Sequence, residues 1–458
     1  MGAYVTENMH LNVILGGVNL RRKLLIVMCI VLLIGLTGCG KKKEEVTVKY
    51  WNSKPEVADV WETIAADYYS ETGVRVEIIN PPTNASNQTL LTAMAKKNPP
   101  TIFKVGGQAN MSVWEPYCRD LSDTELYSWV LDKSMVLTKS DKTGAMAIPY
   151  VVEGYGIIYN NAIMNEYFAL SSKSTAYSSM SEINSFNKLK EVADDMQQHK
   201  DELGIKGVFA STSFASGEEW RWQTHLFNMP LYGEYKKKGV ADLDSIDFMY
   251  GDCYKNIFDL YTEDSTCDKS EIGTKTVNDS MAEFALGECA MVQNGNWAWS
   301  QISSTEGNVV KEADCKYMPI YCGLEGEESQ GLCVGTENYV AVNTLASEEA
   351  QEAAIAFLEW LYGSDKGKAY VTNDLQFITI FNTFASNEAP SNPLAVEVSA
   401  YLNDASKPSV TWDFLTIPSQ EYKDGIANQL YDYTQGKSDW STVTDYAVEQ
   451  WKLQKTGE

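Results

Sequence analysis

The stretch VTVKYWNSKPEVADVWETIAADYYSETGVRVEII, residues 46–79, decides the fold of this 458-residue chain. Its first six residues are rich in β-formers and predict a strand. Ser53 and Glu56 then form a capping box with a proline in the first turn, which predicts the start of a helix. Apolar side chains repeat at helical spacing as far as Gly73, and an alternating apolar run follows from residue 74. The order strand, helix, strand predicts a βαβ unit with parallel strands.

The same alternation of elements continues along the chain. Residues 88–97 predict a helix, residues 101–105 a buried strand, and residues 147–159 an extended apolar stretch. Helical spacing returns at residues 254–261 and 350–361, and helices dominate the last third. No internal repeat is present. We therefore expect an α/β protein that is long enough for more than one lobe.

The composition limits the function classes that are open to the chain. Its 62 acidic and 37 basic residues give a formal charge of −25, a surface that repels phosphate backbones and excludes nucleic-acid binding. The three histidines show no metal-ligand spacing, so we predict neither a metal nor a cofactor. Seven of the nine cysteines lie beyond Cys39 without a C-x-x-C pair, and we expect buried thiols with one or two bridges at most. Cys322 and Cys333 flank a predicted turn and are the first candidate bridge.

The N-terminal region carries a targeting pattern. A basic cluster and a short apolar run precede the sequence LTGC at residues 36–39, an arrangement that resembles a bacterial lipoprotein signal. The alternative, a transmembrane anchor, would need about 20 apolar residues, more than the run contains. The resemblance implies a signal peptide at residues 1–38, acylation of Cys39 and a charged tether at residues 39–45. The protein would then work on the extracytoplasmic face of the cell membrane, held by its lipid alone.

Three segments carry a resemblance to one family. Residues 283–300 read EFALGECAMVQNGNWAWS, residues 148–155 read IPYVVEGY, and residues 335–343 read GTENYVAVN. In their order and spacing they resemble the sugar-binding proteins of ABC importers, the maltose-binding-protein-like class. In that family the Gly-x-Trp turn brings an aromatic side chain to the ligand. The second segment resembles the family's first crossover between lobes, and the third resembles the strand that returns.

The resemblance implies a type II periplasmic-binding-protein-like fold, an α/β fold with two discontinuous lobes joined by a hinge. The N-terminal lobe would comprise residues 46–152 and 330–378. The C-terminal lobe would comprise residues 153–329 and 379–458. The ligand would bind between the lobes of a monomer.

A sugar site needs flat aromatic rings for the apolar C–H faces of the ligand and fixed polar groups for its hydroxyls. The chain has 12 tryptophans and 26 tyrosines beside its acidic excess. The resemblance implies that Trp297 is a stacking platform, that Glu153 is a ligand-binding acid, and that Trp412 reaches the sugar from the C-terminal lobe. A core position for Trp297 and a hinge salt bridge for Glu153 are the alternatives.

The other candidates come from their positions in the chain. Trp222 belongs to a pair of indoles after a glycine-containing turn, and we expect it to be the one that faces the ligand. Asn52 ends the first strand and Gln108 follows two glycines, and ligands of open α/β sheets bind at such strand edges. Glu337 is a further candidate, with capping of the returning strand as its alternative.

We therefore expect a non-enzymatic, lipid-anchored component of an ABC transporter. It would capture a sugar, an oligosaccharide by preference, through hinge closure and deliver it to the permease subunits. Two alternatives stay open. A secreted carbohydrate-active hydrolase would need two carboxylates roughly 5–9 Å apart across the scissile bond. A binding protein for a non-sugar solute would have the same fold with a different site.

Overall fold

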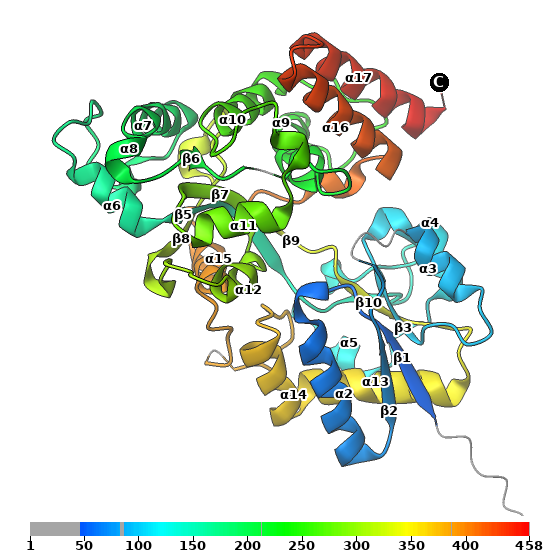
Figure 1. The fold of residues 1–458 in the computed structure, drawn as a ribbon. Helices are drawn as coiled ribbons and strands as arrows, with labels where there is room; N and C mark the ends of the chain where they lie inside the picture. The colour runs from blue at the N-terminus through cyan, green and yellow to red at the C-terminus, as the bar shows by residue number, and fades with distance from the viewer. Residues whose placement is uncertain (1–45, 83–86, 212, 386, 458) are drawn as a thin grey trace, which may run out of the picture. The chain divides into compact units, whose positions relative to one another are not determined.

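The computed structural model describes residues 46–82, 87–211, 213–385 and 387–457, which form an α/β fold with two mixed sheets (Figure 1). We call the elements of the first sheet and its helices the N-terminal lobe, and those of the second sheet the C-terminal lobe. The predicted signal peptide, Cys39 and the tether lie outside the described residues. Within the described part of the chain, no helix is both long and apolar enough to cross a membrane.

The first sheet has the strand order β2-β1-β3-β10-β4. Its strands are β1 (Thr47–Trp51), β2 (Arg75–Ile79), β3 (Ile102–Val105), β4 (Ile148–Pro149) and β10 (Tyr339–Val342). β1 pairs in parallel with both β2 and β3, so the βαβ prediction is confirmed. β10 runs antiparallel between β3 and β4 and brings a distant part of the chain back into this sheet.

The helix between β1 and β2 starts later than the capping box predicts. Pro55–Val57 forms a single 3₁₀ turn, and α2 (Ala58–Thr72) begins only after it, with no side-chain cap on either. The Oδ1 atom of Asn52 instead accepts a hydrogen bond from the backbone N–H of Lys54, at 2.8 Å. The predicted end of α2 is confirmed, because Gly73 adopts the left-handed conformation with φ 72°.

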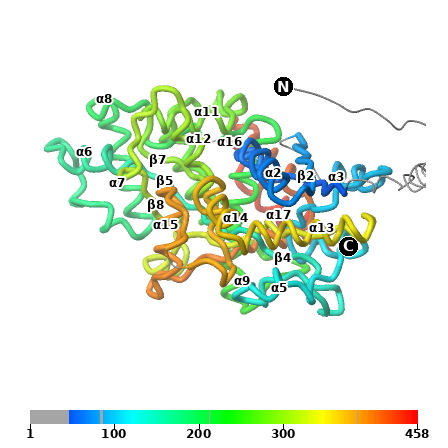
Figure 2. The backbone as a smooth tube through the Cα atoms, turned by 90° about the horizontal axis from the view of Figure 1, so that it is seen from below, coloured from blue at the N-terminus to red at the C-terminus, as the bar shows by residue number. Residues whose placement is uncertain are grey.

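Helices from distant parts of the chain cover this first sheet. They are α2, α3 (Asn87–Met94), α4 (Met111–Trp114), α5 (Glu125–Trp129), α13 (Glu348–Gly363) and α14 (Asp365–Ala369). α2 and α13 contact β2 and β1, respectively, and Figure 2 shows α13 beside the strands from a second direction. Trp61 and Phe357 are fully buried there, in a core that the helix spacing correctly predicts.

The second sheet has the strand order β6-β7-β5-β8, with β9 paired to β5. Its strands are β5 (Glu153–Asn160), β6 (Gly207–Phe209), β7 (Cys289–Gly295), β8 (Cys315–Met318) and β9 (Cys333–Gly335). β5 is almost wholly buried, including the polar residues Glu153 and Asn160 at its two ends.

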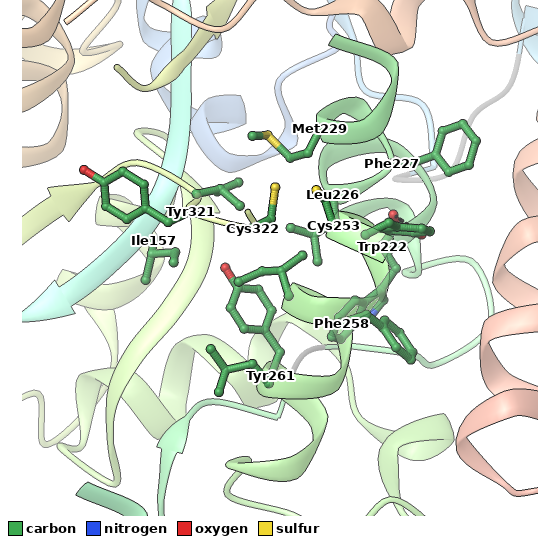
Figure 3. Packing of buried hydrophobic residues seen from close by; sticks show 14 of the residues in the cluster. Ile157, Trp222, Leu226, Phe227, Met229, Cys253, Phe258, Tyr261, Tyr321 and Cys322 are labelled. Atoms are coloured by element: carbon green, nitrogen blue, oxygen red, sulfur yellow. Dashed lines mark hydrogen bonds between the residues drawn. The ribbon is translucent and has the colours of Figure 1, made fainter. Parts of the chain in front are cut away.

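Ten helices are described around this second sheet. They are α6 (Asn161–Ala169), α7 (Phe186–Gln198), α8 (Lys200–Leu203), α9 (Asn228–Lys238), α10 (Gly251–Glu263), α11 (Val277–Ala285), α12 (Ala298–Ser304), α15 (Pro393–Asn403), α16 (Gln420–Thr434) and α17 (Trp440–Thr456). Aromatic and sulfur-bearing side chains fill much of the core between α10 and the sheet (Figure 3).

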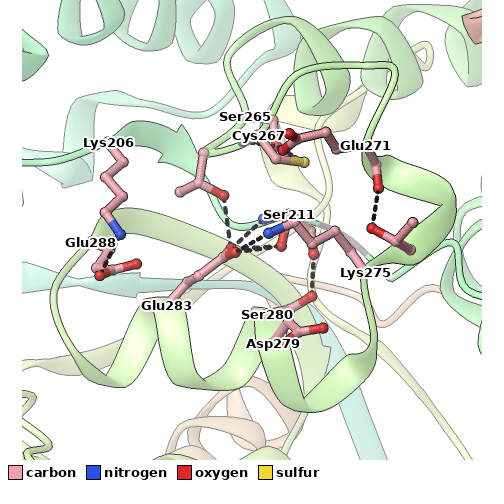
Figure 4. A network of polar contacts seen from close by, with 12 residues as sticks. Lys206, Ser211, Ser265, Cys267, Glu271, Lys275, Asp279, Ser280, Glu283 and Glu288 are labelled. Carbon is pink, nitrogen blue, oxygen red and sulfur yellow. Dashed lines mark hydrogen bonds and ion pairs between the residues drawn. The ribbon is translucent and has the colours of Figure 1, made fainter.

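A partly buried carboxylate ties the end of β6 to α11. The carboxylate of Glu283 accepts hydrogen bonds from the backbone N–H and the hydroxyl of Ser211 and from the hydroxyl of Thr266, each at 2.7 Å (Figure 4). The ammonium of Lys275 lies 3.6 Å from the same carboxylate. Glu283 therefore joins two loops and a helix next to the segment that carries the family resemblance.

Two segments belong to a different lobe from the one to which the predicted ranges assign them. β9 falls within the range predicted for the N-terminal lobe, yet it pairs with β5 of the second sheet. Phe381 falls within the range predicted for the C-terminal lobe, yet it bridges to Val130 and belongs to the first core. The sequence pattern identifies the crossing strands, but it does not fix the residue at which each chain segment passes from one core to the other.

Candidate ligand-binding site

The chain passes between the two sheets at segments that lie side by side. Glu153, at the start of β5, pairs with Gly335 at the end of β9, and Pro149 of β4 pairs with Tyr339 of β10. Val152 also bridges to Ile378, which brings a third connection to the same place. We refer to this region as the crossover. Side chains that reach it come from both lobes, as a ligand site between lobes requires.

Glu153 is buried at the crossover, with 4% of its surface exposed, and both of its carboxylate oxygens have partners. Lys54 Nζ lies 2.5 Å from Oε1, and Asn338 Nδ2 donates to Oε2 at 2.7 Å. Burial alone would lower the pKa of Lys54, but the charges of Glu153 and Glu56 outweigh it and raise that pKa. Glu153 therefore forms a salt bridge with Lys54 at the crossover, which is the alternative role given for it above.

Asn52 positions this ion pair. Its side-chain amide donates to the Lys54 carbonyl at 3.1 Å and to Asn80 Oδ1 at 2.8 Å, while its oxygen accepts from the Lys54 N–H. The turn directs Lys54 toward the crossover. Asn52 is 2% exposed and its hydrogen-bonding groups are used within the turn, so it stabilises the position of Lys54 and does not itself face a ligand.

Trp297 stands at the end of β7, where Gly295 closes the strand and α12 begins at Ala298. A side chain at residue 295 would collide with the Trp297 ring, so the glycine lets the indole fold back over the strand end. The ring is half-buried, and Lys54 Nζ lies 5.8 Å from its centroid. A half-buried indole with a cation nearby suits an apolar ligand face that carries polar substituents.

Trp297 belongs to a group of rings that we call the aromatic cluster. Its members are Tyr155, Trp220, His225, Trp297, Trp412 and Phe414. Tyr155 and His225 stack with centroids 4.1 Å apart and planes 6° from parallel. Trp220 lies 6.3 Å from Trp297, and these two indoles stay half-buried while the other four rings are buried.

His225 is held neutral at the centre of the cluster. Burial, followed by the charge of Arg221, lowers the pKa of His225 to about 3. Its Nδ1 lies 3.2 Å from Gln293 Nε2. The ring therefore acts as an uncharged aromatic surface at physiological pH.

Glu337 lies among three lysines at the crossover. Burial would raise the pKa of Glu337, but the charges of Lys104, Lys423 and Lys54 outweigh it and lower this pKa to about 2. Lys104 Nζ lies 3.2 Å from Glu337 Oε1, and the Glu337 side chain keeps 46% of its surface exposed. Burial lowers the pKa of Lys423, and the opposing charge of Glu337 only partly offsets this. Because Lys104 extends from β3 and Lys423 from α16, charges from both lobes act on Glu337.

Two of the predicted residues lie away from this surface. Trp222 is 1% exposed and packs against Phe258 and Tyr261 in the core of the C-terminal lobe (Figure 3), so its expected position facing the ligand is corrected. Gln108 uses its amide to bind the backbone of Thr138 in both directions, at 3.0 and 3.1 Å. It closes a loop of the N-terminal lobe through these two bonds.

Trp412 reaches the site but lies beneath it. It is 7% exposed and packs on Tyr155 and Phe414. A Cβ at Gly335 would lie 2.6 Å from Trp412 Cγ, so the glycine of β9 admits the indole. Trp412 therefore supports the aromatic cluster instead of presenting an exposed face.

The sequence favours Trp222 over Trp220, and it gives no indication of His225, Lys54 and Lys423. Trp220 sits in the same segment as Trp222, and the six-residue π-helix Arg221–Leu226 that follows it changes which side chains face the core. Lys54 is hidden within the capping-box pattern. No local signal marks Lys423, which arrives from the C-terminal helices.

Neither of two cavities in the described part of the chain, nor its possible metal ligands, indicates a second candidate site. A cavity of about 60 Å³ lies behind Trp297 and Glu153, room for a water or two. A larger one of about 350 Å³ is lined by Tyr232, Tyr250 and Pro408 and contains no crossover residue. No group of three or more potential metal ligands occurs in the described part of the chain.

Comparisons with known proteins agree with the two-lobe fold. The family model described as bacterial extracellular solute-binding protein matches residues 63–397. The solute-binding protein RafE in complex with raffinose has a similar structure, with a TM-score of 0.66 and 16% identity over 90% of this chain and 100% of that chain. A chitin oligosaccharide binding protein has a TM-score of 0.69 and 14% identity, over 90% of this chain and 100% of that one. A sugar transporter from Bacillus licheniformis in complex with stachyose has a TM-score of 0.61 and 17% identity, over 89% and 100%.

At these identities the structural likeness establishes the two-lobe periplasmic-binding-protein-like fold, as the sequence predicts. No curated protein sequence matches the chain. The family assignment rests on the family model, which covers more than half of the chain. A binding protein releases its solute unchanged, in agreement with the prediction that the chain is not an enzyme. The chain belongs to the bacterial extracellular solute-binding proteins.

Proposed function

We propose that the chain captures an oligosaccharide at the crossover and delivers it to the permease subunits of an ABC importer. One observation carries this proposal. Two half-buried indoles, Trp220 and Trp297, lie 6.3 Å apart beside charged groups that extend from both lobes. The solved structures with raffinose, stachyose and a chitin-oligosaccharide binder share the fold and support the same ligand class.

The residues divide the work of recognition by their chemistry. The exposed faces of Trp297 and Trp220 stack on the C–H faces of sugar rings, while the buried members of the cluster hold them rigid. Glu337, Lys104 and Lys423 offer charge-assisted hydrogen bonds to hydroxyls, at roughly 1.5–3 kcal/mol each before ordering costs. Two stacked rings and a few such bonds suffice for micromolar binding, which needs about −8 kcal/mol net.

Glu153, Asn52 and Trp412 act indirectly in this proposal. The Glu153 carboxylate fixes Lys54 beneath the Trp297 ring, Asn52 shapes the turn that aims Lys54, and Trp412 supports Tyr155. Gln108 and Trp222 stabilise their own lobes. A ligand that binds these surfaces together would favour hinge closure, because its contacts are complete only when groups from both lobes meet.

The proposed lipid anchor would hold the binding protein at the membrane surface. Acylation at Cys39 and a short tether at residues 39–45 would hold a monomer at the membrane, where released sugar meets the permease at a high local concentration. The acidic surface, with a net charge of −25, would keep the body of the protein off anionic lipid.

The proposal is tested by a thermal-shift screen of the chain from residue 40 onward against mono-, di- and oligosaccharides, followed by chromatography of the recovered ligand. We expect at least one oligosaccharide to raise the unfolding temperature and to be recovered intact, because a ligand that binds only the folded state stabilises it. A shift with amino acids, peptides or polyamines but with no saccharide would favour the non-sugar alternative. Cleavage of the sugar would contradict the proposal.

A further inference from the structure

Seven cysteines of the described residues are free thiols in this structure, and two of them meet. Cys253 lies on α10 and Cys322 on the loop after β8. Figure 3 shows the two sulfur atoms next to each other in the core. Cys253 is 7% exposed and Cys322 is fully buried.

The backbone around both thiols is fixed from two sides. Asn256, one turn after Cys253 on α10, donates its amide to the Cys322 carbonyl at 3.2 Å. The carboxylate of Glu327 accepts from the backbone N–H groups of Cys322 and Gly323, at 2.9 and 2.8 Å. A Cβ at residue 323 would lie 3.8 Å from Cys253 Sγ. The loop is thus held against the helix at the position where the sulfurs meet.

The pair that the sequence favours is not the pair that the fold brings together. Cys333 Sγ donates toward Met229 Sδ at 3.7 Å, and its other contact is with Tyr155. Cys322 faces Cys253 instead. The bridge predicted between Cys322 and Cys333 is therefore corrected, because β9 directs Cys333 toward α9 while the loop after β8 directs Cys322 toward α10.

We propose that Cys253 and Cys322 are the site of a disulfide bond in the exported protein. The family is extracellular, and disulfides form and persist outside the reducing cytosol. The inference rests on that compartment and on the thiol geometry, and it does not depend on which solute is bound.

The oxidation needs a disulfide-class oxidant, such as an exported thiol–disulfide oxidoreductase or oxidised glutathione. The thiolate of Cys253 attacks the oxidant disulfide and releases one thiolate. Cys322 then loses its proton and attacks Cys253 Sγ, which forms the protein disulfide and releases the second thiolate. Two protein thiols become one disulfide while the oxidant disulfide becomes two thiols.

The burial of the pair sets when the bond forms and what it does. Buried thiols react slowly, so the step belongs to folding, before the core of the C-terminal lobe closes. Once formed, the bond joins α10 to the loop after β8 across a long stretch of chain and restricts the unfolded state. It lies outside the crossover, so reduction should lower thermal stability and leave solute affinity unchanged.

The test uses the chain from residue 40 onward, collected from the medium of a secreting host or refolded with oxidised glutathione. It is unfolded without reductant, alkylated and mapped by mass spectrometry. We expect a peptide pair linked through Cys253 and Cys322, and alkylated thiols at the other five mature positions. Alkylation of both Cys253 and Cys322 after refolding with the oxidant would overturn the proposal, as would a bridge between Cys322 and Cys333.

Two variants separate the bond from simple packing. In Cys333→Ala, the matched control, the linked peptide should persist. In the double variant Cys253→Ala/Cys322→Ala, a reductant should no longer shift the unfolding temperature, whereas it should lower that of the oxidised parent by about 5 °C. An equal response of both proteins to reductant would contradict the proposal. Calorimetric titration with the sugar found in the screen is run in parallel, so that failure of the disulfide and failure of sugar binding are seen separately.

Discussion

Replacing Trp297 by alanine tests the aromatic part of the site most sharply. The ring folds over Gly295, lies 6.3 Å from Trp220 and has Lys54 Nζ 5.8 Å from its centroid. The residue is half-buried, and we expect the accessible part of its ring to stack on a sugar. The substitution removes that face while it leaves the strand β7 and the buried rings of the cluster in place.

The expected loss follows from what one stacked indole contributes. Aromatic stacking beyond area burial is worth about 0.5–1.5 kcal/mol, and truncation of a central aromatic anchor costs about 2 kcal/mol or more. We therefore expect sugar affinity to fall by about 5–30-fold, the equivalent of about 1–2 kcal/mol. The assay is isothermal titration calorimetry, with circular dichroism to show that the variant is folded. Trp297→Phe should keep part of the affinity.

The control removes an indole from the other lobe. Trp360 on α13 donates its Nε1–H to Glu71 at 2.9 Å and packs against the first core. Trp360→Ala should lower stability without changing sugar affinity. If folded Trp297→Ala binds as tightly as the parent protein, or if Trp360→Ala weakens binding by the same factor, Trp297 is not the stacking platform.

Three further predictions follow from the same structure. Lys423→Met should weaken sugar binding by about 5–10-fold, because it removes an ammonium whose charge acts on Glu337. Lys437→Met changes an exposed position and should leave the sugar affinity unchanged. If the two variants bind the sugar equally tightly in calorimetry, Lys423 is not part of the site. Glu283→Ala should lower the free energy of unfolding by roughly 2–4 kcal/mol in urea titrations, since three donors lose their acceptor, and a loss below about 1 kcal/mol would contradict this. His225 binds its proton more readily in the unfolded chain, because its pKa falls from 6.5 to about 3 on folding, so its contribution to stability is complete above pH 6.5 and falls as the pH drops toward 3. When the pH falls from 6.5 to 5, the free energy of unfolding of His225→Asn should therefore decrease by about 2 kcal/mol less than that of the parent, as measured by urea titration. An identical pH dependence of the two proteins would refute the low pKa of His225.

The framework of the fold could be predicted because each element carries its own periodicity. The βαβ unit at residues 46–79 has alternating strands, a helical apolar spacing and a glycine stop, and all three features appear in the structure. The start of α2 could not be predicted, since Asn52 and Lys54 serve a long-range ion pair with Glu153 that the local capping pattern does not contain. Local rules fail here at the point where the chain builds its site.

The site was predictable only in part for a similar reason. The Gly-x-Trp turn indicates Trp297, because a strand that ends in glycine leaves room for the ring. The exchange of Trp220 for Trp222 was not predictable, since the π-helix Arg221–Leu226 shifts the angular positions that ordinary helical spacing assigns. The charges of Lys104 and Lys423 both act on Glu337 only because the crossover brings two lobes together.

The central claim is that this extracellular solute-binding protein holds an intact oligosaccharide at the aromatic cluster. Calorimetric titration of the chain from residue 40 onward with raffinose, stachyose, malto-oligosaccharides and chitin oligosaccharides tests it directly. The account predicts one site per chain for at least one of these sugars, a dissociation constant on the order of 1 μM and a negative heat-capacity change from apolar burial. An absence of binding heat with every saccharide at two temperatures, from protein shown to be folded, would contradict it.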